Sequence, residues 1–364
     1  MVKQLFVMRA FACLCIAMYY AIGTASSSYP LSIHSTEQRI WFYLFPLLLC
    51  AAPMFIFISE FLVARAYPDQ PKKGFLVNRL RYMMIPYVSM GIFYAAFEAG
   101  ISRSLDIFTS KLWSNMMLGG FHGYFVLIIF QFYLLHLFFH KIADACKPVI
   151  VLAGAFLIQA AYLWLAAEFW YEPGQRFSFW WYPFTGWLFY FTAAYYAGRY
   201  DLQFEQLLSR HWKWIAVLLP IAGAMFVWLY PMNLFPLGSK RPDIIIYAIA
   251  AICALFLVAT KIKRPPKLIV WISQLSFGIY LLNPFFYRCF EKVLSGLLVP
   301  HLSFSLYTFV LFGASTSASM LAVWLLQRLP LGSYLVGKIG KGFHEEREAE
   351  LRSPKEGAPL TPRV

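Results

Sequence analysis

The chain is poor in charge. Asp, Glu, Lys and Arg form only 13% of its 364 residues, against a usual share of about 25% in soluble proteins. Hydrophobic residues make up 60% of the chain and aromatic residues 20%, which excludes intrinsic disorder and collagen-like repeats. A soluble fold cannot hide this much apolar surface. The composition therefore predicts a polytopic membrane protein.

Cysteine is also scarce, and its six positions are scattered along the chain. None forms a CxxC pair or stands in a cluster with histidine, which excludes a disulfide scaffold and leaves zinc without a set of ligands. We therefore expect buried thiols and no metal. The cysteines are Cys13, Cys15, Cys50, Cys146, Cys253 and Cys289.

Long apolar runs dominate what is present, and ten of them are long enough to suggest membrane helices. The fold class expected is therefore all-α, with about ten transmembrane helices. The runs lie near residues 5–25, 40–63, 82–100, 121–139, 148–168, 184–198, 214–230, 244–260, 268–287 and 304–327.

Basic residues outnumber acidic residues by 31 to 17, a net charge of +14. They separate the apolar runs and do not gather in one patch, so they indicate orientation in a lipid bilayer and not a nucleic-acid partner. The short segments on the side of the amino terminus carry most of them. By the positive-inside rule, both termini are expected in the cytoplasm.

We expect residues 1–330 to form the membrane domain and residues 331–364 a disordered cytoplasmic tail. The first run resembles a signal peptide, with Lys3 ahead of it and small residues at 21–26. Cleavage is disfavoured because Arg9 lies inside the apolar stretch. The aromatic, proline-broken segment 168–183 suits an interfacial anchor, or alternatively a re-entrant lid.

Arg9 and Tyr20 are the first polar pair at membrane depth. Eleven residues turn a helix through about 1100° and raise it about 16 Å, so the two side chains share one face. An arginine near the cytoplasmic end can hold a phosphate or carboxylate, while a polar group deeper in the membrane meets the other end of a long ligand. The alternative is that Arg9 reaches the lipid headgroups and Tyr20 lies at the interface.

Two further sites stand at the ends of membrane runs. Ser59 and Glu60 close the second run, where Glu60 is either a base held in a cavity or a helix-end group in cytoplasmic water. Arg79 and Arg81 precede the third run. They suit an anionic ligand, although anchoring at the cytoplasmic face explains them equally well.

His122 opens the fourth run, followed by Tyr124 and Gln131. A histidine at a membrane mouth can take and return a proton near neutral pH, so His122 is the best candidate for a general base. A purely structural histidine is the alternative.

Polar side chains also recur at helical spacing in the ninth run: Ser273, Ser276, Tyr280 and Asn283. They share one face. Such a stripe either lines a cavity or joins two helices.

Six motifs in order resemble the membrane acyltransferase family 3, whose members O-acylate surface glycans. The resemblance covers about residues 5–330, and within the family the chain most resembles the intercellular-adhesion C proteins of poly-N-acetylglucosamine systems. The motifs are LFVMRAFACLCIAMYYA (5–21), PMFIFISEFLVAR (53–65), LVNRLRYMMIPY (76–87), GGFHGYFVLIIFQFYLL (119–135), YPFTGWLFYFTAAYYAGRY (182–200) and ISQLSFGIYLLNPFF (272–286).

The resemblance implies an enzyme of the bacterial cytoplasmic membrane. It implies transfer of an acyl group, of the acetyl or succinyl class, from cytoplasmic acyl-CoA to a hydroxyl of a surface or lipid-linked glycan, beside the glycan synthase machinery. Arg9, Arg79 and His122 match the family's two arginines and its later histidine. The expected catalytic residues are His122, Tyr20 and Glu60; the expected acyl-CoA ligands are Arg9, Arg79 and Arg81; the expected acceptor ligands are Ser59, Tyr124, Gln131, Tyr280 and Asn283.

Three positions depart from the family pattern. Tyr20 and Asn283 stand where the family has histidine, and Glu60 replaces the glycine of a Ser-Gly pair. Tyrosine is a poor base at neutral pH and asparagine is none. These departures favour the alternative function, a glycan export or assembly factor that keeps the fold without acyl chemistry.

Overall fold

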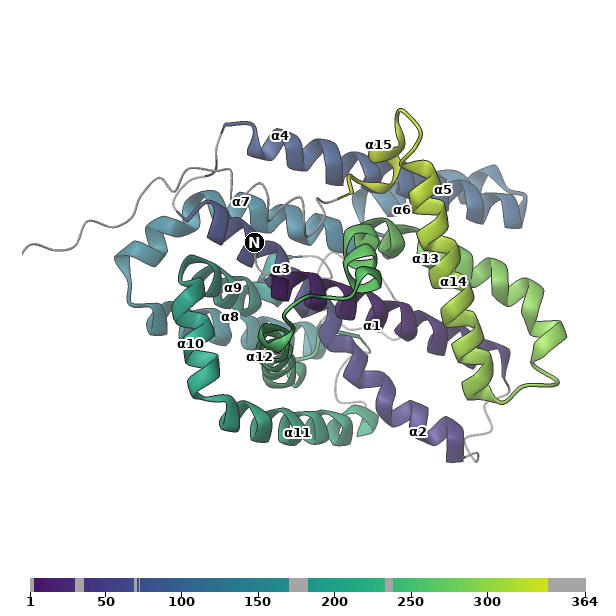
Figure 1. Ribbon diagram of the computed structural model, residues 1–364. Helices are drawn as coiled ribbons and strands as arrows, with labels where there is room; N and C mark the ends of the chain where they lie inside the picture. The colour runs from purple at the N-terminus through teal and green to yellow at the C-terminus, as the bar shows by residue number, and fades with distance from the viewer. Residues whose placement is uncertain are drawn as a thin grey trace, which may run out of the picture.

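The computed structural model describes residues 3–29, 36–68, 71, 73–169, 183–232 and 238–339. Within these ranges the chain forms helices and no strand, so the expected all-α class is confirmed (Figure 1). Residues 170–182, most of the segment expected to be an anchor or lid, lie outside the described ranges, as do residues 340–364 of the expected tail.

Within the described ranges, nine helices are long and apolar enough to cross a membrane. They coincide with nine of the ten apolar runs. Their bounds are α1 (Lys3–Ser28), α2–η1–α3 (Thr36–Leu44, Phe45–Cys50, Ala51–Ala66), α4–η2–α5 (Phe75–Arg79, Leu80–Met84, Ile85–Ser102), α7 (Tyr124–Ala145), α8 (Pro148–Phe169), α11–η5 (Trp212–Leu229, Tyr230–Met232), α12 (Ile244–Lys261), α13 (Lys267–Leu298) and α14 (Phe304–Leu326). The shorter elements are α6 (Leu105–Met117), η4 (Phe184–Trp187), α9 (Leu188–Arg199), α10 (Asp201–Arg210) and α15 (Gly332–Val336).

The run at 184–198 forms η4 and α9, which together are shorter than the nine long helices. Eight of the twelve residues of α9 are buried, and the helix packs along α3. Gly198 allows this contact, because a Cβ built on it would lie 2.4 Å from the carbonyl oxygen of Phe61. The tenth run is therefore a short and largely buried helix.

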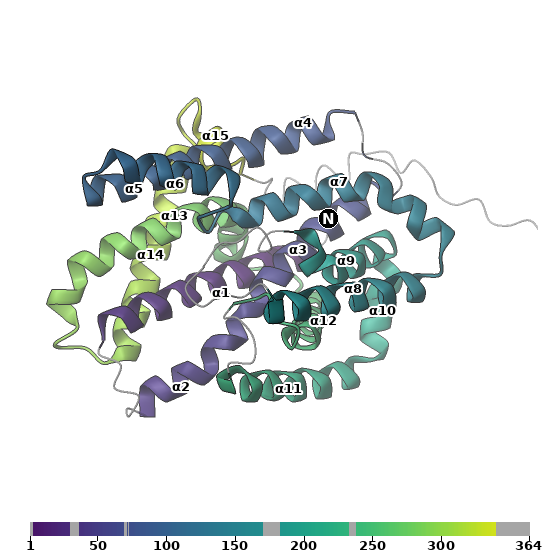
Figure 2. The same cartoon turned by 180° about the vertical axis from the view of Figure 1, so that it is seen from behind.

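Helix α1 runs through the middle of the bundle, beside α3 and α13 in both views (Figures 1 and 2). Its buried positions include Ala10, Ala12, Ala17, Ala21 and Ala25. Small side chains let helix backbones approach closely within a membrane protein. The sequence of α1 therefore accounts for its central place.

A hairpin of α5 and α6 directs the loop that carries His122. A Cβ on Gly91 would lie 2.1 Å from Cε of Met116, and the buried Asn115 side-chain amide donates to the Gly91 carbonyl at 2.8 Å. The Asn115 bond clamps the hairpin at this crossing, where a Cβ on Gly91 would displace the end of the Met116 side chain. Residues 118–123 then connect this hairpin to α7.

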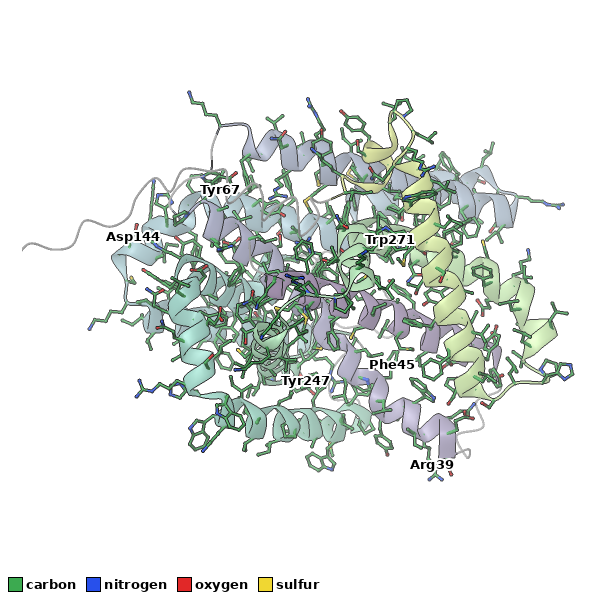
Figure 3. The ribbon with its side chains drawn as sticks, in the orientation of Figure 1. Arg39, Phe45, Tyr67, Asp144, Tyr247 and Trp271 are labelled. Carbon is green, nitrogen blue, oxygen red and sulfur yellow. The ribbon has the colours of Figure 1, made fainter. Side chains whose placement is uncertain are left out.

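The outside of the bundle is apolar. Val149, Leu157 and Trp164 of α8 and Trp214 and Trp228 of α11 are all more than half exposed, which is the pattern of a lipid-facing surface. All six cysteines are free; Cys13, Cys15 and Cys50 are buried as expected, whereas Cys146 is exposed. In Figure 3, Arg39 lies at the opposite end of the molecule from Tyr67 and Asp144, as expected for a segment that spans it between residues 36 and 66.

Residues 331–339 differ from the expected disordered tail. They include α15, and Val336 is buried, with Leu335 and Ile339 packed against the same core. The apolar side chains that follow Gly332 suffice to fold this segment back onto the bundle.

We expect Gly198→Ala to lower the melting temperature of the detergent-solubilised protein. The new methyl group overlaps the Phe61 carbonyl, and overpacking of this kind costs about 1–3 kcal/mol. Gly154→Ala on α8 is the control, because a Cβ there has no atom within 4 Å. Equal melting temperatures for the two variants would contradict the close packing of α3 and α9.

Candidate active site

A cavity of about 1030 Å³ opens beside α1. Its walls come from α1, α3, α7, α13 and the α4–η2 segment, together with residues 238–239 and 338–339. Seven of the eleven expected site residues line it: Arg9, Tyr20, Ser59, Arg79, His122, Tyr124 and Tyr280. Residues far apart in the sequence thus meet at one cavity.

Arg9 and Tyr20 both line the cavity, as their eleven-residue spacing predicts. Tyr20 stacks near Tyr287, with ring centroids 6.3 Å apart, and the Tyr287 hydroxyl donates to the Ala17 carbonyl at 2.7 Å. The contact attaches α13 to α1 at the depth of Tyr20. The face shared by Arg9 and Tyr20 is therefore the face that α1 presents to the cavity.

Pro284 lies inside α13 at the site. Proline lacks an amide hydrogen, and its ring displaces the carbonyls of the preceding turn. In an unbroken helix the Phe285 amide donates to the Leu281 carbonyl. Here the Tyr94 hydroxyl bonds to both groups: it accepts from the Phe285 amide at 3.2 Å and donates to the Leu281 carbonyl at 2.9 Å.

The same Leu281 carbonyl fixes His122, whose Nε2 lies 3.1 Å from it. A carbonyl oxygen only accepts, so Nε2 carries the hydrogen and Nδ1 carries the lone pair. The Tyr280 hydroxyl donates to the main-chain carbonyl of His122. Together the two bonds set the tautomer and the position of the imidazole, which is what a general base requires.

Aromatic rings surround His122. The ring centroid of Tyr94 lies 4.8 Å away, that of Tyr280 lies 5.5 Å away and that of Tyr20 lies 6.4 Å away. Phe125 continues this wall. An aromatic wall with hydroxyl groups suits the apolar faces and hydroxyl groups of a sugar.

Basic residues line the cavity as well. Arg9, Lys73, Arg79 and Lys338 come from four different segments. The guanidinium of Arg79 lies 4.9 Å from the ring centroid of Tyr133, and the Tyr133 hydroxyl pairs with the Ser59 hydroxyl at 2.9 Å. None of the described lining residues is Asp or Glu. This part of the cavity is therefore suited to an anion.

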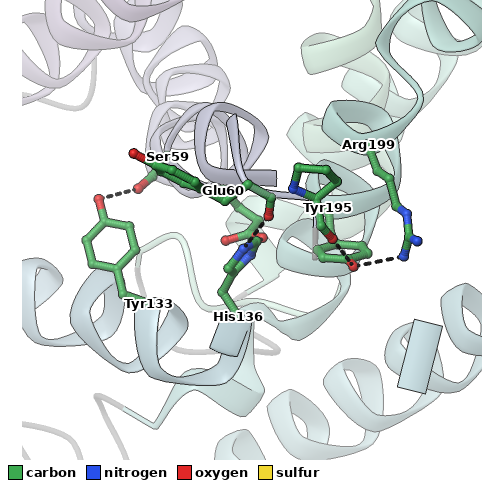
Figure 4. A network of polar contacts seen from close by, with 8 residues as sticks. Ser59, Glu60, Tyr133, His136, Tyr195 and Arg199 are labelled. Atoms are coloured by element: carbon green, nitrogen blue, oxygen red, sulfur yellow. Dashed lines mark hydrogen bonds and ion pairs between the residues drawn. The ribbon is translucent and has the colours of Figure 1, made fainter. Parts of the chain in front are cut away.

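Glu60 does not line the cavity, and its sequence neighbour Ser59 does. Its Oε1 lies 2.7 Å from Nδ1 of His136, and both side chains are buried. His136 Nε2 donates to the Tyr67 carbonyl at 3.1 Å. Figure 4 shows this pair close to Tyr195 and Arg199. Neither expectation for Glu60, a cavity base or a group in water, describes this buried pair.

Three other expected residues also lie away from the cavity lining. Gln131 accepts from the Phe184 amide at 3.1 Å and so holds the start of η4. Asn283 accepts from the Ser319 hydroxyl at 3.3 Å and joins α13 to α14. Arg81 is exposed beside the π-helical turn η2. For the polar stripe of α13, both alternatives hold, since Tyr280 lines the cavity while Asn283 joins two helices.

No sequence pattern singles out Tyr94, Lys73 or Lys338. Tyr94 follows no motif, and only its contacts with Leu281 and Phe285 of α13 give its hydroxyl a role. Lys338 belongs to the region expected to be disordered. Lys73 is one of several basic residues ahead of the third run. Among the described residues, no group of three His, Cys, Asp or Glu side chains could hold a metal ion.

Comparison with known proteins identifies the family of the chain. A family model described as an acyltransferase domain matches residues 2–324. The chain belongs to this acyltransferase 3 family. It is similar to the "Putative membrane-bound acyltransferase YfiQ" of Bacillus subtilis, with 34% identity over 96% of this chain and 98% of that protein.

Two other relatives carry a different description. The "Probable poly-beta-1,6-N-acetyl-D-glucosamine export protein" of Staphylococcus aureus is 25% identical over 77% of this chain and 81% of that protein. The protein of the same name from Staphylococcus epidermidis is 27% identical over 77% and 80%. No solved structure matches the chain. The acyltransferase 3 protein described here is thus a multi-pass membrane protein with both kinds of relative.

We expect His136→Ala to destabilise the protein strongly. Removing one partner of a buried ion pair leaves the other without compensation and costs about 3–5 kcal/mol. Melting of the purified protein in detergent measures the loss. His211→Ala is the control, since His211 is exposed. An unchanged melting temperature with lost activity would instead place Glu60 and His136 in the chemistry.

Proposed function

We propose that this protein transfers an acyl group from acyl-CoA to a hydroxyl of a surface or lipid-linked glycan. The observation that carries the proposal is a single cavity lined by basic residues and by a histidine held with Nδ1 unprotonated. Membership of the acyltransferase 3 family and the relative named as a membrane-bound acyltransferase support it.

The basic residues Arg9 and Arg79 bind the phosphates of the donor. Arginine offers several donors in a fixed fork and so recognises phosphate oxygens well. We place this end of the cavity at the cytoplasmic face, where acyl-CoA is available and where the positive-inside rule puts both termini. The protein then lies in the bacterial cytoplasmic membrane, and the thioester reaches about 16 Å along α1 from Arg9 to Tyr20.

His122 acts as the general base. Its Nδ1 takes the proton of the acceptor hydroxyl while that oxygen attacks the thioester carbonyl. Tyr20, next to His122, donates a hydrogen bond to the oxygen that becomes negative. The carbon–sulfur bond then breaks, the thiolate leaves with the proton, and the products are an ester and the free thiol of coenzyme A.

This assignment accounts for the departure at position 20. The family has histidine there, whereas here a tyrosine stands 6.4 Å, between ring centroids, from His122. A base supplied by the loop beside α1 replaces a base on α1. Tyr124 and Tyr280 line the same part of the cavity and contact the acceptor sugar through ring faces and hydroxyl groups.

Export of the glycan without acyl transfer is the second candidate. It is favoured by the relatives named as export proteins and by Asn283 in place of a histidine. The two functions differ in whether a donor is consumed.

Mass spectrometry of surface glycans tests the proposal. Cells that lack the gene are complemented with the wild-type chain, with His122→Ala or with His211→Ala. We expect ester-linked acyl groups to disappear in the deletion and to return with the wild type and His211→Ala. His122→Ala should restore at most about one part in 100 of the activity, because a general base contributes about 10²–10⁴-fold.

The second candidate predicts a different result. Glycan that stays inside the cell or disappears, with its acylation unchanged, would contradict acyl transfer and support export. Full acylation with a folded His122→Ala protein would contradict the role of His122.

A further inference from the structure

We propose that residues 331–339 form an arm that covers the basic end of the cavity, and that Lys338 on this arm binds a phosphate group of the ligand. The proposal deepens the proposed function, because it adds a ligand contact at the same cavity. It depends on that function only for the identity of the ligand.

The arm returns to the bundle at a defined point. Gly332 begins α15 after the short connection 327–331 that follows α14, and a Cβ on it would lie 1.7 Å from the Leu326 carbonyl oxygen. The side-chain amide of Gln327 donates to the Gly337 carbonyl. Val336 is only 2% exposed. These contacts hold the arm at both ends and in its middle.

Gly337 gives the arm its final turn. Its φ is +80°, and a Cβ would lie 2.3 Å from the Phe277 ring. Both facts require glycine. The turn places Lys338 and Ile339 in the lining of the cavity, so the buried residue Val336 anchors a segment whose next residues face the ligand space.

The arm also contacts the helical turn that carries a donor-binding arginine. Tyr334 of the arm stacks on Tyr82 of η2 with ring centroids 5.9 Å apart, and Nζ of Lys338 lies 5.4 Å from the Tyr82 ring centroid. Arg79 lies about one turn before Tyr82. Figure 1 accordingly shows α15 beside the α4–α5 segment.

The cavity at this place is built for an anion. Arg9, Lys73, Arg79 and Lys338 supply positive charge, and no described lining residue supplies negative charge. Ser273, a residue only 1% exposed, is also in the cavity lining.

The ligand chemistry is therefore a phosphate or pyrophosphate. Two molecules could bring it to this cavity: a coenzyme A thioester or a polyprenyl pyrophosphate carrier of the glycan. Arg9 and Arg79 are part of helices in the cavity wall, whereas Lys338 is an exposed residue of the arm. The charge of Lys338 therefore reaches the ligand only when the arm is in place.

Ligand binding to the full-length protein in lipid nanodiscs tests the proposal, with coenzyme A and farnesyl pyrophosphate as separate probes. We expect Lys338→Glu to weaken binding of the active probe about tenfold, equivalent to about 1.4 kcal/mol, and to reduce the dependence of affinity on salt. Gly337→Ala, which displaces the arm, should act in the same direction. Arg328→Glu is the control, since Arg328 is exposed and outside the cavity lining.

The outcomes separate the two proposals. Weaker binding of coenzyme A in Lys338→Glu supports both the arm and the proposed donor. An effect on farnesyl pyrophosphate alone supports the arm and contradicts acyl-CoA as the donor. Wild-type affinity of Lys338→Glu for both probes, or no binding of either probe to the wild type, would overturn the role of the arm.

Discussion

The site depends on one main-chain carbonyl, that of Leu281. Pro284 lies in the same part of α13, and the carbonyl accepts hydrogen bonds from Tyr94 and from His122. Inside a membrane protein a polar group without a partner costs several kcal/mol, because no water is available to satisfy it. The buried Tyr94 hydroxyl and the His122 ring thus share one acceptor, which holds the imidazole in place.

Three segments must be in register for this arrangement to form. The hairpin of α5 and α6 brings the loop of His122 to α13, and Asn115 and Gly91 hold that hairpin closed. Helix α13 is fixed to α1 through Tyr287 and Ala17. Since α1 also carries Arg9 and Tyr20, the same packing that builds the centre of the bundle sets the distance between the basic residues and the base.

The fold could be predicted largely from apolar runs, since nine of them became long helices. The close packing of α9 against α3 could not, because it depends on a tertiary contact between Gly198 and the Phe61 carbonyl that the hydropathy of α9 does not reveal. Arg9 and Tyr20 were placed on one face by helical geometry alone. The buried position of Glu60 could not be predicted, because its partner His136 is 76 residues away in the sequence and no local pattern joins the two. Lys338 follows a stretch interrupted by Pro330, Gly332 and Gly337, so only the folded arm brings it to the cavity.

Nitrogen NMR of the protein labelled with ¹⁵N-histidine tests the central claim most directly, with His122 assigned by its absence in His122→Gln. The account predicts, at neutral pH, a neutral imidazole whose Nε2 is protonated and whose Nδ1 is not. It also predicts that Tyr94→Phe, which removes the hydroxyl bonded to the Leu281 carbonyl, broadens or shifts this signal. A protonated Nδ1, or a signal indifferent to Tyr94→Phe, would contradict the claim that the Leu281 carbonyl holds the proposed base His122.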